Sequence, residues 1–376
     1  QVTVNQVRPV SIEDLLGREP VALDWEGIRR GLTDRVILVT GGGGSIGSEL
    51  CRQIAASGPS RLLVVDSCEF NLYRIDMELR NLHPGLEIDC RLLDVTDAAA
   101  VKGLFQRAHP EIVFHAAAYK HVPLLEHQVH AAVRNNVIGT ELVARAAGES
   151  GCRQFVLIST DKAVNPTNVM GATKRAAELL CQSLEGHSST RFTAVRFGNV
   201  LGSAGSVVPL FRRQIQQGGP VTVTHPDIER FFMTIPEACQ LIMQAAAIGK
   251  GGEIFVLDMG EPVKIGYLAE QMIRLSGKQP GEDIAIEYIG LRPGEKLYEE
   301  LFYDSEDLGR TSHPKIHVAV SGRAPSPHIL DDALSTLRST MQTCDDEALR
   351  AALEGLLPQS LQKPEADAAA VETANG

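Results

Sequence analysis

Short apolar runs alternate with amphipathic segments through the first 200 residues of the chain. RVILVT at 35–40 and RLLVVD at 61–66 predict buried strands, and between them Ile46, Leu50 and Ile54 share one helical face over 45–57. Further strands are expected at 88–94, 111–118, 153–160 and 193–197. Further helices are expected near 69–81, at a segment that ends near Ala108, at roughly 130–149, and at a segment that carries Met170 and Lys174 and runs to about 185. This alternation predicts an α/β fold with a Rossmann-type, doubly wound parallel sheet.

The regular alternation stops after Asn199, where Gly- and Pro-rich turns and shorter elements predict a smaller α/β substrate-binding lobe. The expected organisation is a lead-in at 1–33, a Rossmann domain at 34–200 to which 236–260 returns, a lobe from 201–235 and 261–330, a helical segment at 331–360 and a disordered tail at 361–376. Within the lead-in, Ser11 and Asp14 have the spacing of a helix capping box.

A glycine-rich loop joins the first strand to the first helix. TGGGGSIG at 40–47 spaces Gly41, Gly44 and Gly47 as G-x-x-G-x-x-G, with Ser45 and Ile46 opening the helix. This context is typical of a dinucleotide site, because a Cβ at these glycines would hold a pyrophosphate away from the helix N-terminus. The candidate cofactor ligands are therefore Gly41, Gly44, Ser45, Ile46 and Gly47.

Acidic and small residues after the next strands extend this site. Asp66 ends the second strand, where a carboxylate accepts hydrogen bonds from ribose hydroxyls and repels a 2′-phosphate, so NAD is favoured over NADP. Asp94 either reaches the adenine edge or caps a turn. Ala116 and Ala118 are small enough for the backbone to pass close to the cofactor.

Reactive side chains follow the fifth strand directly. Ligands bind at the carboxyl ends of parallel strands, so Thr160, Asp161 and Lys162 are candidates for acid–base chemistry, with a capped polar turn as the alternative. For Asp161 and Lys162 to act as an acid–base pair, the pKa of one side chain must be raised and the pKa of the other lowered. One helical turn separates Met170 from Lys174, a candidate for the nicotinamide ribose. A familiar dehydrogenase pattern has Tyr at the Met position, and a thioether cannot transfer its proton.

Polar residues elsewhere suggest the remainder of a cleft. Lys120 and His121 follow the fourth strand, and Asn199 follows the sixth. In the second lobe, Arg230, Arg292 and Lys296 are candidates for binding a diphosphate, and Glu295 for accepting a hydrogen bond from a ribose hydroxyl. One of Asn135 and Asn136, in the helix expected at 130–149, either contacts the cofactor-side backbone or has a capping role.

Composition limits the possible classes of partner. The chain has 376 residues, 44% of them hydrophobic and 22% charged, with a formal net charge of -11 and no basic block, which argues against nucleic acid. Its 7 Cys form no CxxC pair, so neither a disulfide framework nor a metal site is expected.

We find no signal peptide and no apolar run of about 18 residues, and expect a cytoplasmic protein. The chain begins with Gln, so membrane segments of a longer protein are expected to lie outside it.

Together, TGGGGSIG, HAAAYKHVPLLE, STDKAVNPTNVMGATK, RFGNVLGSAGSVVPLF and LRPGEKLYEEL resemble the extended short-chain dehydrogenase/reductases, over roughly residues 6–320. More narrowly, they resemble the UDP-N-acetylglucosamine 4,6-dehydratases, in the large membrane-anchored subgroup with Met in place of Tyr. The resemblance implies that NAD takes a hydride from C4 of the sugar, that water is eliminated across C5 and C6, and that the hydride returns to C6.

The resemblance also assigns roles. It implies that Asp161 is the acid for the C6 hydroxyl, that Lys162 is the base at C5, and that Thr160 binds the C4 oxygen. Val207 lies in a segment similar to the one that lines the uridine pocket. The implied partners are a UDP-sugar and further copies of the chain, associated through helices beside the active-site helix. The implied full-length protein is anchored at the inner face of the cell membrane.

Two alternatives stay open. A UDP-sugar 4-epimerase shares the C4 hydride transfer but needs no acid–base pair at C5 and C6. A non-catalytic NAD-binding protein would account for Met170 but would not require the intact cluster at 159–162. The pair formed by Asp161 and Lys162 favours the dehydratase.

Overall fold

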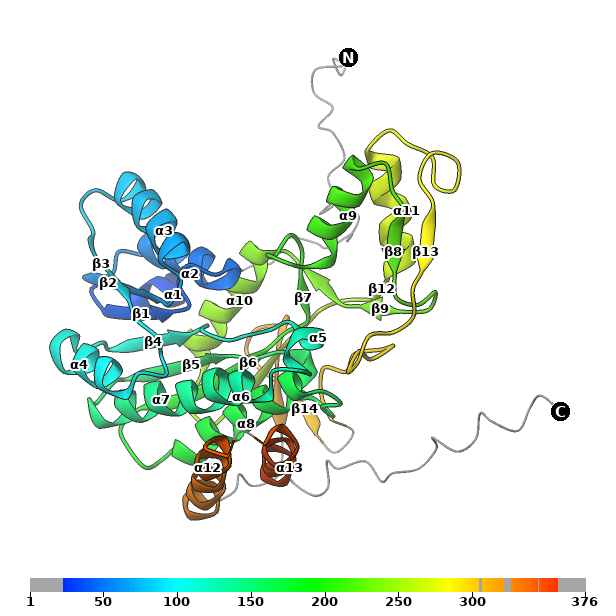
Figure 1. Cartoon of the computed structure of the whole chain (residues 1–376). Helices are drawn as coiled ribbons and strands as arrows, with labels where there is room; N and C mark the ends of the chain where they lie inside the picture. The colour runs from blue at the N-terminus through cyan, green and yellow to red at the C-terminus, as the bar shows by residue number, and fades with distance from the viewer. Residues whose placement is uncertain (1–22, 304–305, 321–325, 344, 358–376) are drawn as a thin grey trace.

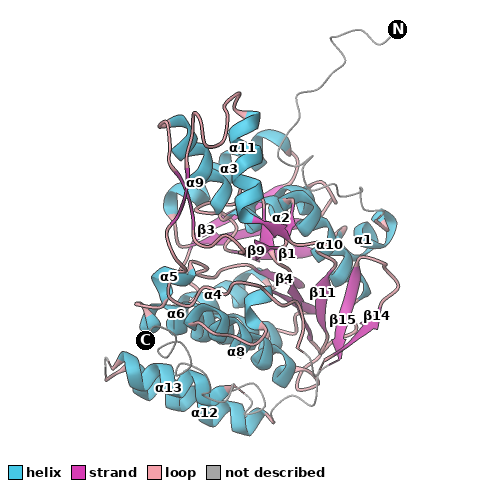
Figure 2. Ribbon diagram, turned by 90° about the vertical axis from the view of Figure 1, so that its right-hand side faces the viewer, coloured by secondary structure: helices cyan, strands magenta, loops and turns pink. Residues whose placement is uncertain are grey.

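The computed structural model describes residues 23–303, 306–320, 326–343 and 345–357, and its main body is a nine-stranded sheet with helices on both faces (Figures 1 and 2). The strand order is β14-β15-β11-β6-β5-β4-β1-β2-β3. Seven strands are parallel: β1 (Val36–Thr40), β2 (Arg61–Asp66), β3 (Glu87–Leu92), β4 (Ile112–His115), β5 (Gln154–Ile158), β6 (Arg191–Arg196) and β11 (Ile254–Leu257). The predicted Rossmann-type α/β fold is confirmed.

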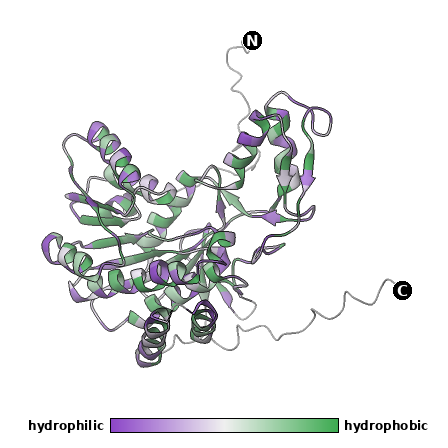
Figure 3. Ribbon diagram, viewed as in Figure 1, coloured by the Kyte–Doolittle hydropathy of each residue, from purple (hydrophilic) through white to green (hydrophobic). Residues whose placement is uncertain are grey.

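Each face of the sheet packs against its own set of helices. One set is α1 (Trp25–Leu32), α2 (Ser45–Ala55), α3 (Glu69–Leu82) and α10 (Ile235–Ile248), and the other is α4 (Ala98–Ala108), α7 (Gly139–Glu149) and α8 (Val169–Leu184). Along β1, Ile37 and Val39 join the first apolar cluster and Leu38 joins the second. Because both faces are covered there, β1, β4 and β11 are apolar at nearly every position (Figure 3).

A helical hairpin adds a further layer outside α8. Helices α12 (Pro327–Met341) and α13 (Asp346–Leu356), the red elements of Figure 1, both pack on α8, and α13 also packs on α6 (Val129–Ala132). Their buried leucines, including Leu337 and Leu353, join one cluster with Leu179 and Leu180 of α8. The outer face of α8 is therefore covered by this chain's own C-terminal helices.

The second lobe has a core of its own, which includes Phe211, Val221 and Ile273. It consists of α9 (Val207–Gln216), α11 (Ile265–Leu275) and three short strand pairs: β8 (Val221–Val223) with β13 (Ile286–Tyr288), β9 (Glu229–Arg230) with β12 (Val263–Lys264), and β7 (Asn199–Val200) with β10 (Phe232–Met233). The remaining short helix, α5 (Val122–Leu125), lies on the main body beside α8.

Three expectations about organisation are corrected. Within the predicted lobe segment 261–330, β14 (Asp307–Arg310) and β15 (Ile316–Val320) instead extend the main sheet antiparallel to β11, because an open strand edge accepts partners from any part of the chain. Helix α1 of the predicted lead-in packs on α10, so the main body begins earlier than residue 34. A π-helical turn, Val133–Ile138, interrupts the helix expected at 130–149.

Some expectations lie outside the described residues, namely the capping box at Ser11 and Asp14 and the tail at 361–376. Among the helices that the structure describes, none has the length and apolarity needed to cross a membrane.

Candidate active site

A cavity of about 870 Å³ runs between the carboxyl ends of the parallel strands and the lobe. The candidates from the sequence line it except Asp66, Asp94, Asn135, Asn136, Asp161 and Lys296. The lining candidates are Gly41, Gly44, Ser45, Ile46, Gly47, Ala116, Ala118, Lys120, His121, Thr160, Lys162, Lys174, Asn199, Val207, Arg230, Arg292 and Glu295. The fold thus brings together side chains from both lobes around one space.

The glycine loop fits a dinucleotide, although for a reason that differs in part from the expected one. Gly41 has φ +65°, and a Cβ there would lie 2.7 Å from the backbone nitrogen of Ala117. A Cβ on Gly47 would collide with the carbonyl oxygen of Gly41. These two glycines therefore allow the loop to pack against protein backbone rather than clearing space for the ligand. Gly44 begins α2 without a side-chain cap, which leaves the first helical N–H groups free to bind a pyrophosphate.

Asp66 and Asp94 both hold turns. Asp66 accepts hydrogen bonds from the N–H groups of Gly43, at 2.9 Å, and Cys68, at 2.8 Å, which fixes its carboxylate beside the glycine loop. Asp94 Oδ1 accepts from the N–H of Thr96 at 2.8 Å. Asp94 therefore caps a turn, which is the second of the two roles predicted for it.

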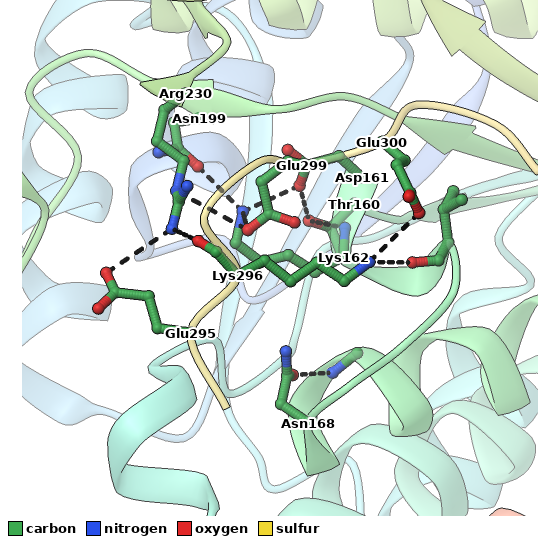
Figure 4. Close-up of polar contacts among 12 residues, drawn as sticks. Thr160, Asp161, Lys162, Asn168, Asn199, Arg230, Glu295, Lys296, Glu299 and Glu300 are labelled. Carbon is green, nitrogen blue, oxygen red and sulfur yellow. Dashed lines mark hydrogen bonds and ion pairs between the residues drawn. The ribbon is translucent and has the colours of Figure 1, made fainter. Parts of the chain in front are cut away.

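A polar cluster lies immediately after β5 (Figure 4). Asp161 opens a 3-10 turn, and its Oδ1 accepts from Thr160 Oγ1 at 2.8 Å and from Lys162 Nζ at 3.0 Å. Lys162 Nζ also donates to Asn199 Oδ1 at 3.1 Å. Asp161 is 0% exposed and does not line the cavity, whereas Thr160, Lys162 and Asn199 do. The predicted pair forms, but its carboxylate lies beneath the cavity wall.

The electrostatics of Lys162 differ from the expectation for a base. Burial by itself would lower the pKa of this lysine, but the charges of Asp161 and Glu299 outweigh burial, so the pKa is raised. Lys162 is therefore an ammonium in the free protein, and it must lose a proton before it can act as a base.

Glu299 was missed by the sequence analysis as a site residue, although it lies within the quoted run LRPGEKLYEEL. Its side chain is 3% exposed, lines the cavity, and places Oε1 3.4 Å from Lys162 Nζ. Burial, followed by repulsion from Asp161, raises the pKa of Glu299 despite the nearby Lys162. No local spacing in the sequence links position 299 to position 162; only the contact between lobes does.

Lys174 and Met170 lie side by side on α8. Lys174 Nζ donates to the carbonyl oxygen of Ile158 at 2.6 Å, and burial lowers the pKa of Lys174 to about 8. Met170 is 3% exposed; it packs in the apolar cluster beneath the C-terminal hairpin and also reaches the cavity wall. The surroundings of Met170 are those of a packing residue.

Arg230 binds backbone carbonyl oxygens of its own lobe. Its guanidinium donates to the carbonyl oxygens of Glu229, Lys296 and Leu297 at 2.7, 2.7 and 3.2 Å, and lies 3.8 Å from Glu299 Oε1. These contacts use three of the five guanidinium N–H groups and hold the 295–299 segment in place; Arg230 also lines the cavity, so its contact with a diphosphate stays a prediction.

The other lobe candidates lie close by. Glu295 Oε2 accepts from the backbone N–H of Arg292 at 3.1 Å, and both residues line the cavity. Lys296 donates to the carbonyl oxygen of Val164 at 3.0 Å instead, and it is not among the cavity-lining residues.

A loop at 201–206 closes one side of the cavity. Lys120 Nζ donates to Ser203 Oγ at 3.2 Å, and the N–H of Ala204 donates to Ser45 Oγ at 3.1 Å. Burial lowers the pKa of Lys120, and the charge of Lys162 lowers it further. The pKa of His121 is also lowered, first by burial and then by Lys120.

A buried network supports the cluster from behind. Ser159 Oγ donates to Glu178 Oε1 at 2.6 Å, and Arg196, which is 0% exposed, bridges Glu178 and Glu306 at 2.8 Å. Tyr303 Oη donates to the carbonyl oxygen of Ala163 at 2.6 Å. Ser159 belongs to the cluster predicted at 159–162, whereas Glu178, Arg196, Tyr303 and Glu306 were not predicted, because their partners are distant along the chain.

Asn136 lies in the π-helical turn and supports the Tyr119 backbone. Its amide accepts from the Tyr119 N–H at 2.8 Å and donates to the Tyr119 carbonyl oxygen at 2.9 Å. It therefore holds backbone beside Lys120 and Ala118, close to the role expected for it. Among the described residues, no group of three or more His, Cys, Asp or Glu could hold a metal ion.

Known proteins resemble this chain in sequence over most of its length. The model of the polysaccharide biosynthesis protein family matches residues 37–321. The chain is 54% identical over 319 residues to the capsular polysaccharide biosynthesis protein CapD of Staphylococcus aureus, covering 84% of this chain and 53% of that protein. It is 52% identical over 326 residues to the probable polysaccharide biosynthesis protein EpsC of Bacillus subtilis, covering 86% and 54%. The chain thus spans about half the length of these two relatives.

Solved structures show the same architecture. Pen from Bacillus thuringiensis matches with a TM-score of 0.71 and 36% identity, over 79% of this chain and 90% of that one. A dTDP-glucose 4,6-dehydratase, DesIV of Streptomyces venezuelae, shares the fold at a TM-score of 0.62 and 21% identity, over 70% and 87%. The chain therefore belongs to the polysaccharide biosynthesis protein family, in the group of extended short-chain dehydrogenase/reductases that resemble UDP-N-acetylglucosamine 4,6-dehydratases.

Proposed function

We propose that this chain is the catalytic part of a nucleotide-sugar 4,6-dehydratase, which converts UDP-N-acetylglucosamine into a UDP-4-keto-6-deoxy sugar for surface-polysaccharide or glycan synthesis. The main support is the position of Lys162. Its Nζ lies between the carboxylates of Asp161 and Glu299, at 3.0 and 3.4 Å, in a cavity shared by the glycine loop and the lobe. Dehydration needs such a combination of acid and base, because a proton leaves C5 while the C6 hydroxyl leaves as water.

The residues present fit a nicotinamide cofactor, and NAD is proposed over NADP. The start of α2 offers N–H groups to a pyrophosphate, and the carboxylate of Asp66 at the end of β2 would repel a 2′-phosphate. When bound, NAD supplies a hydride acceptor for C4 and a hydride donor for C6. Lys174 would hold the nicotinamide ribose from α8.

In this proposal the protein's own groups move the protons. Neutral Lys162 takes the C5 proton, and the Thr160 hydroxyl, held by Asp161, hydrogen-bonds the C4 oxygen. A carboxyl beside Lys162 gives its proton to the departing C6 hydroxyl and recovers one from the C4 hydroxyl, which loses its proton when C4 is oxidised. Lys162 returns a proton to C5 when the hydride adds to C6. Met170 needs no part in these steps, so its presence does not mark a dead enzyme.

A UDP-sugar 4-epimerase is the second candidate, because relatives with that name exist. UDP-glucose 4-epimerase of Rickettsia canadensis is 33% identical over 287 residues, covering 74% of this chain and 80% of that protein. Epimerisation inverts C4 without breaking a bond at C5 or C6, so it gives no task to the groups around Lys162. A protein that only binds NAD is the remaining alternative.

Mass spectrometry separates these possibilities. Purified protein is incubated with UDP-N-acetylglucosamine and NAD in heavy water. We expect a product lighter by one water that carries one solvent deuterium on the sugar. An isobaric product inverted at C4 would establish the epimerase, and bound NAD with no sugar conversion would contradict both enzymatic functions.

We also propose that the whole protein is attached to the inner face of the cell membrane through a segment outside this chain, and that it forms homo-oligomers. A relative from Methanocaldococcus jannaschii, 47% identical over 279 residues, is named a membrane protein. Fractionation of cells that express the full-length protein tests the first proposal: recovery in the membrane pellet supports it, and recovery only in the supernatant contradicts it.

A further inference from the structure

Glu126 lies where α5, α8 and α13 meet. It follows α5 directly, and its side chain is 11% exposed. Its Oε1 accepts a hydrogen bond at 2.6 Å from the backbone N–H of Val169, the first residue of α8. The guanidinium of Arg350, from α13, donates to Glu126 Oε2 at 3.1 Å and to the Glu126 carbonyl oxygen at 3.0 Å. One residue thus joins the C-terminal hairpin to the start of the helix that carries Lys174.

The same carboxylate lies against the second lobe. Gly294, in the 292–295 loop, has φ +73°, and a Cβ built there would lie 3.2 Å from Glu126 Cδ and 2.7 Å from Asn168 Cβ. Asn168 Nδ2 donates to the Gly294 carbonyl oxygen at 3.1 Å, and its Oδ1 caps α8 by accepting from the N–H of Gly171 at 2.7 Å (Figure 4). Glycine suits both the positive φ and the close approach. The loop predicted to bind the diphosphate is therefore fixed against the start of α8.

The start of α8 also lies against the turn that carries Lys162. A Cβ built on Gly171 would collide with the carbonyl oxygen of Lys162, so the helix and the turn pack backbone to backbone. Asn168 and Met170, at the start of α8, line the cavity, as Lys162 does. The start of α8 is therefore a shared support for the 292–295 loop and for Lys162.

Glu126 and Arg350 act on this site without facing it. Neither is among the described residues that line the cavity, so neither is expected to touch a substrate. Arg350 uses two nitrogens on two oxygens of Glu126, and such a fork fixes direction as well as distance. Without the guanidinium, the Glu126 carboxylate would be free to turn away from Val169 and Gly294.

We propose that Glu126 is a positioning residue for the nucleotide-sugar site and that Arg350 holds it in place, so the C-terminal hairpin is a working part of the active site. This inference rests on the proposed function, because it takes the 292–295 loop as the loop that binds the diphosphate. Loss of the pair should loosen this loop and the start of α8, which weakens binding of the UDP part. The glycine loop between β1 and α2 has no share in these contacts, so affinity for NAD should be kept.

Calorimetric titration of the purified chain with UDP and, separately, with NAD tests the inference. The variants are Arg350→Met, Arg350→Lys, Glu126→Gln and the double variant of Glu126→Gln with Arg350→Met. Glu126→Gln keeps an oxygen that can accept from Val169 but loses the charge that faces Arg350.

Arg338→Met is the matched control. Arg338 lies on α12 of the same hairpin and pairs with Glu141 of α7, a carboxylate that is 5% exposed. The exposed fractions of the two arginine side chains are similar, at 42% for Arg338 and 35% for Arg350. Neither Arg338 nor Glu141 lines the cavity, so this variant weakens the docking of the hairpin without touching the support of the site.

We expect Arg350→Met and Glu126→Gln each to raise the Kd of UDP by about 3- to 30-fold. The kcat for UDP-N-acetylglucosamine should fall by a similar factor, because the start of α8 also supports Lys162. Arg350→Lys should recover part of the UDP affinity, since an ammonium can still pair with Glu126 Oε2. In the Glu126→Gln background, Arg350→Met should change the Kd of UDP by less than about twofold, because both residues act through one contact. The Kd of NAD in every variant, and the Kd of UDP in Arg338→Met, should stay within about twofold of wild type.

Three results would overturn the inference: an unchanged Kd of UDP in Arg350→Met, equal weakening in Arg338→Met, or additive effects in the double variant. Loss of NAD binding in Arg350→Met would also overturn it, because the effect would then be a general loss of structure. If wild type binds UDP but does not convert UDP-N-acetylglucosamine, the proposed function fails, while the UDP affinities still decide the role of Glu126. If wild type binds no UDP, the inference fails together with the proposed function.

Discussion

Lys174 of α8 donates a hydrogen bond to the carbonyl oxygen of Ile158 at the end of β5, with 2.6 Å between Nζ and oxygen. This contact joins the helix to the strand directly beneath the cavity. The lysine is 5% exposed, and burial lowers its pKa from 10.5 to about 8. A buried amine with a shifted pKa should leave a measurable mark on stability.

We expect Lys174→Met to remove part of the pH dependence of unfolding. Between pH 8 and 10.5 the folded protein releases the Lys174 proton while the unfolded chain keeps it, so the unfolding free energy of wild type rises with pH. Relative to the variant, wild type should gain on the order of 1–2 kcal/mol between pH 7.5 and 9.5. Urea denaturation at both pH values measures this difference.

Lys264→Met provides the control, because the Lys264 side chain is 54% exposed. Its replacement should change the unfolding free energy by the same amount at both pH values. A constant difference between wild type and Lys174→Met would show that Lys174 keeps its ordinary proton affinity in the folded protein.

Met170→Leu should leave dehydratase activity within about threefold of wild type. The thioether transfers no proton, and exchange of Met for Leu conserves volume within a packed cluster. Steady-state kcat with UDP-N-acetylglucosamine measures the effect. A loss of a hundredfold or more, with unchanged stability, would mean that the sulfur takes part in the reaction.

Tyr303→Phe should destabilise the protein by about 1–3 kcal/mol, because the carbonyl oxygen of Ala163 loses its 2.6 Å partner. The variant should also lower kcat more than it changes KM, since this hydrogen bond holds the turn that carries Asp161 and Lys162. Denaturation and steady-state kinetics give the two values. Tyr298→Phe is the matched control, because Tyr298 is 54% exposed and should tolerate the change.

Leu337→Ala should cost about 2–5 kcal/mol, because Leu337 is 0% exposed in the cluster between the C-terminal hairpin and α8. Ile329→Ala on the same helix should stay within about 0.5 kcal/mol, since Ile329 is 64% exposed. Equal effects of the two variants on chemical denaturation would mean that α12 does not pack on α8 in solution.

The C-terminal hairpin of α12 and α13 also affects which surface is available for self-association. Association through the helices beside the active-site helix was expected from related enzymes, yet α12 and α13 cover the outer face of α8. An oligomer of this chain would therefore use another surface, or the hairpin would have to move.

Local patterns in the sequence determined the elements and the cofactor end of the site. The strand at 61–66 and the helix begun by Gly44 follow from side-chain periodicity and from backbone requirements within a few residues, which any folded context must respect. For the same reason Thr160, Lys162 and Lys174 were identified as neighbours: each comes next to the end of β5, or one turn into the helix that follows.

Only the tertiary structure decided which distant groups share one environment. Glu299 and Lys162 are 137 positions apart, and their contact depends on how the lobe closes over the sheet. The same packing engages Arg230 with backbone carbonyls, buries Asp161 beneath the cavity wall and adds β14 and β15 to the main sheet. A pKa depends on burial and on every charge nearby, so the protonation of this site is a property of the folded chain that local sequence does not contain.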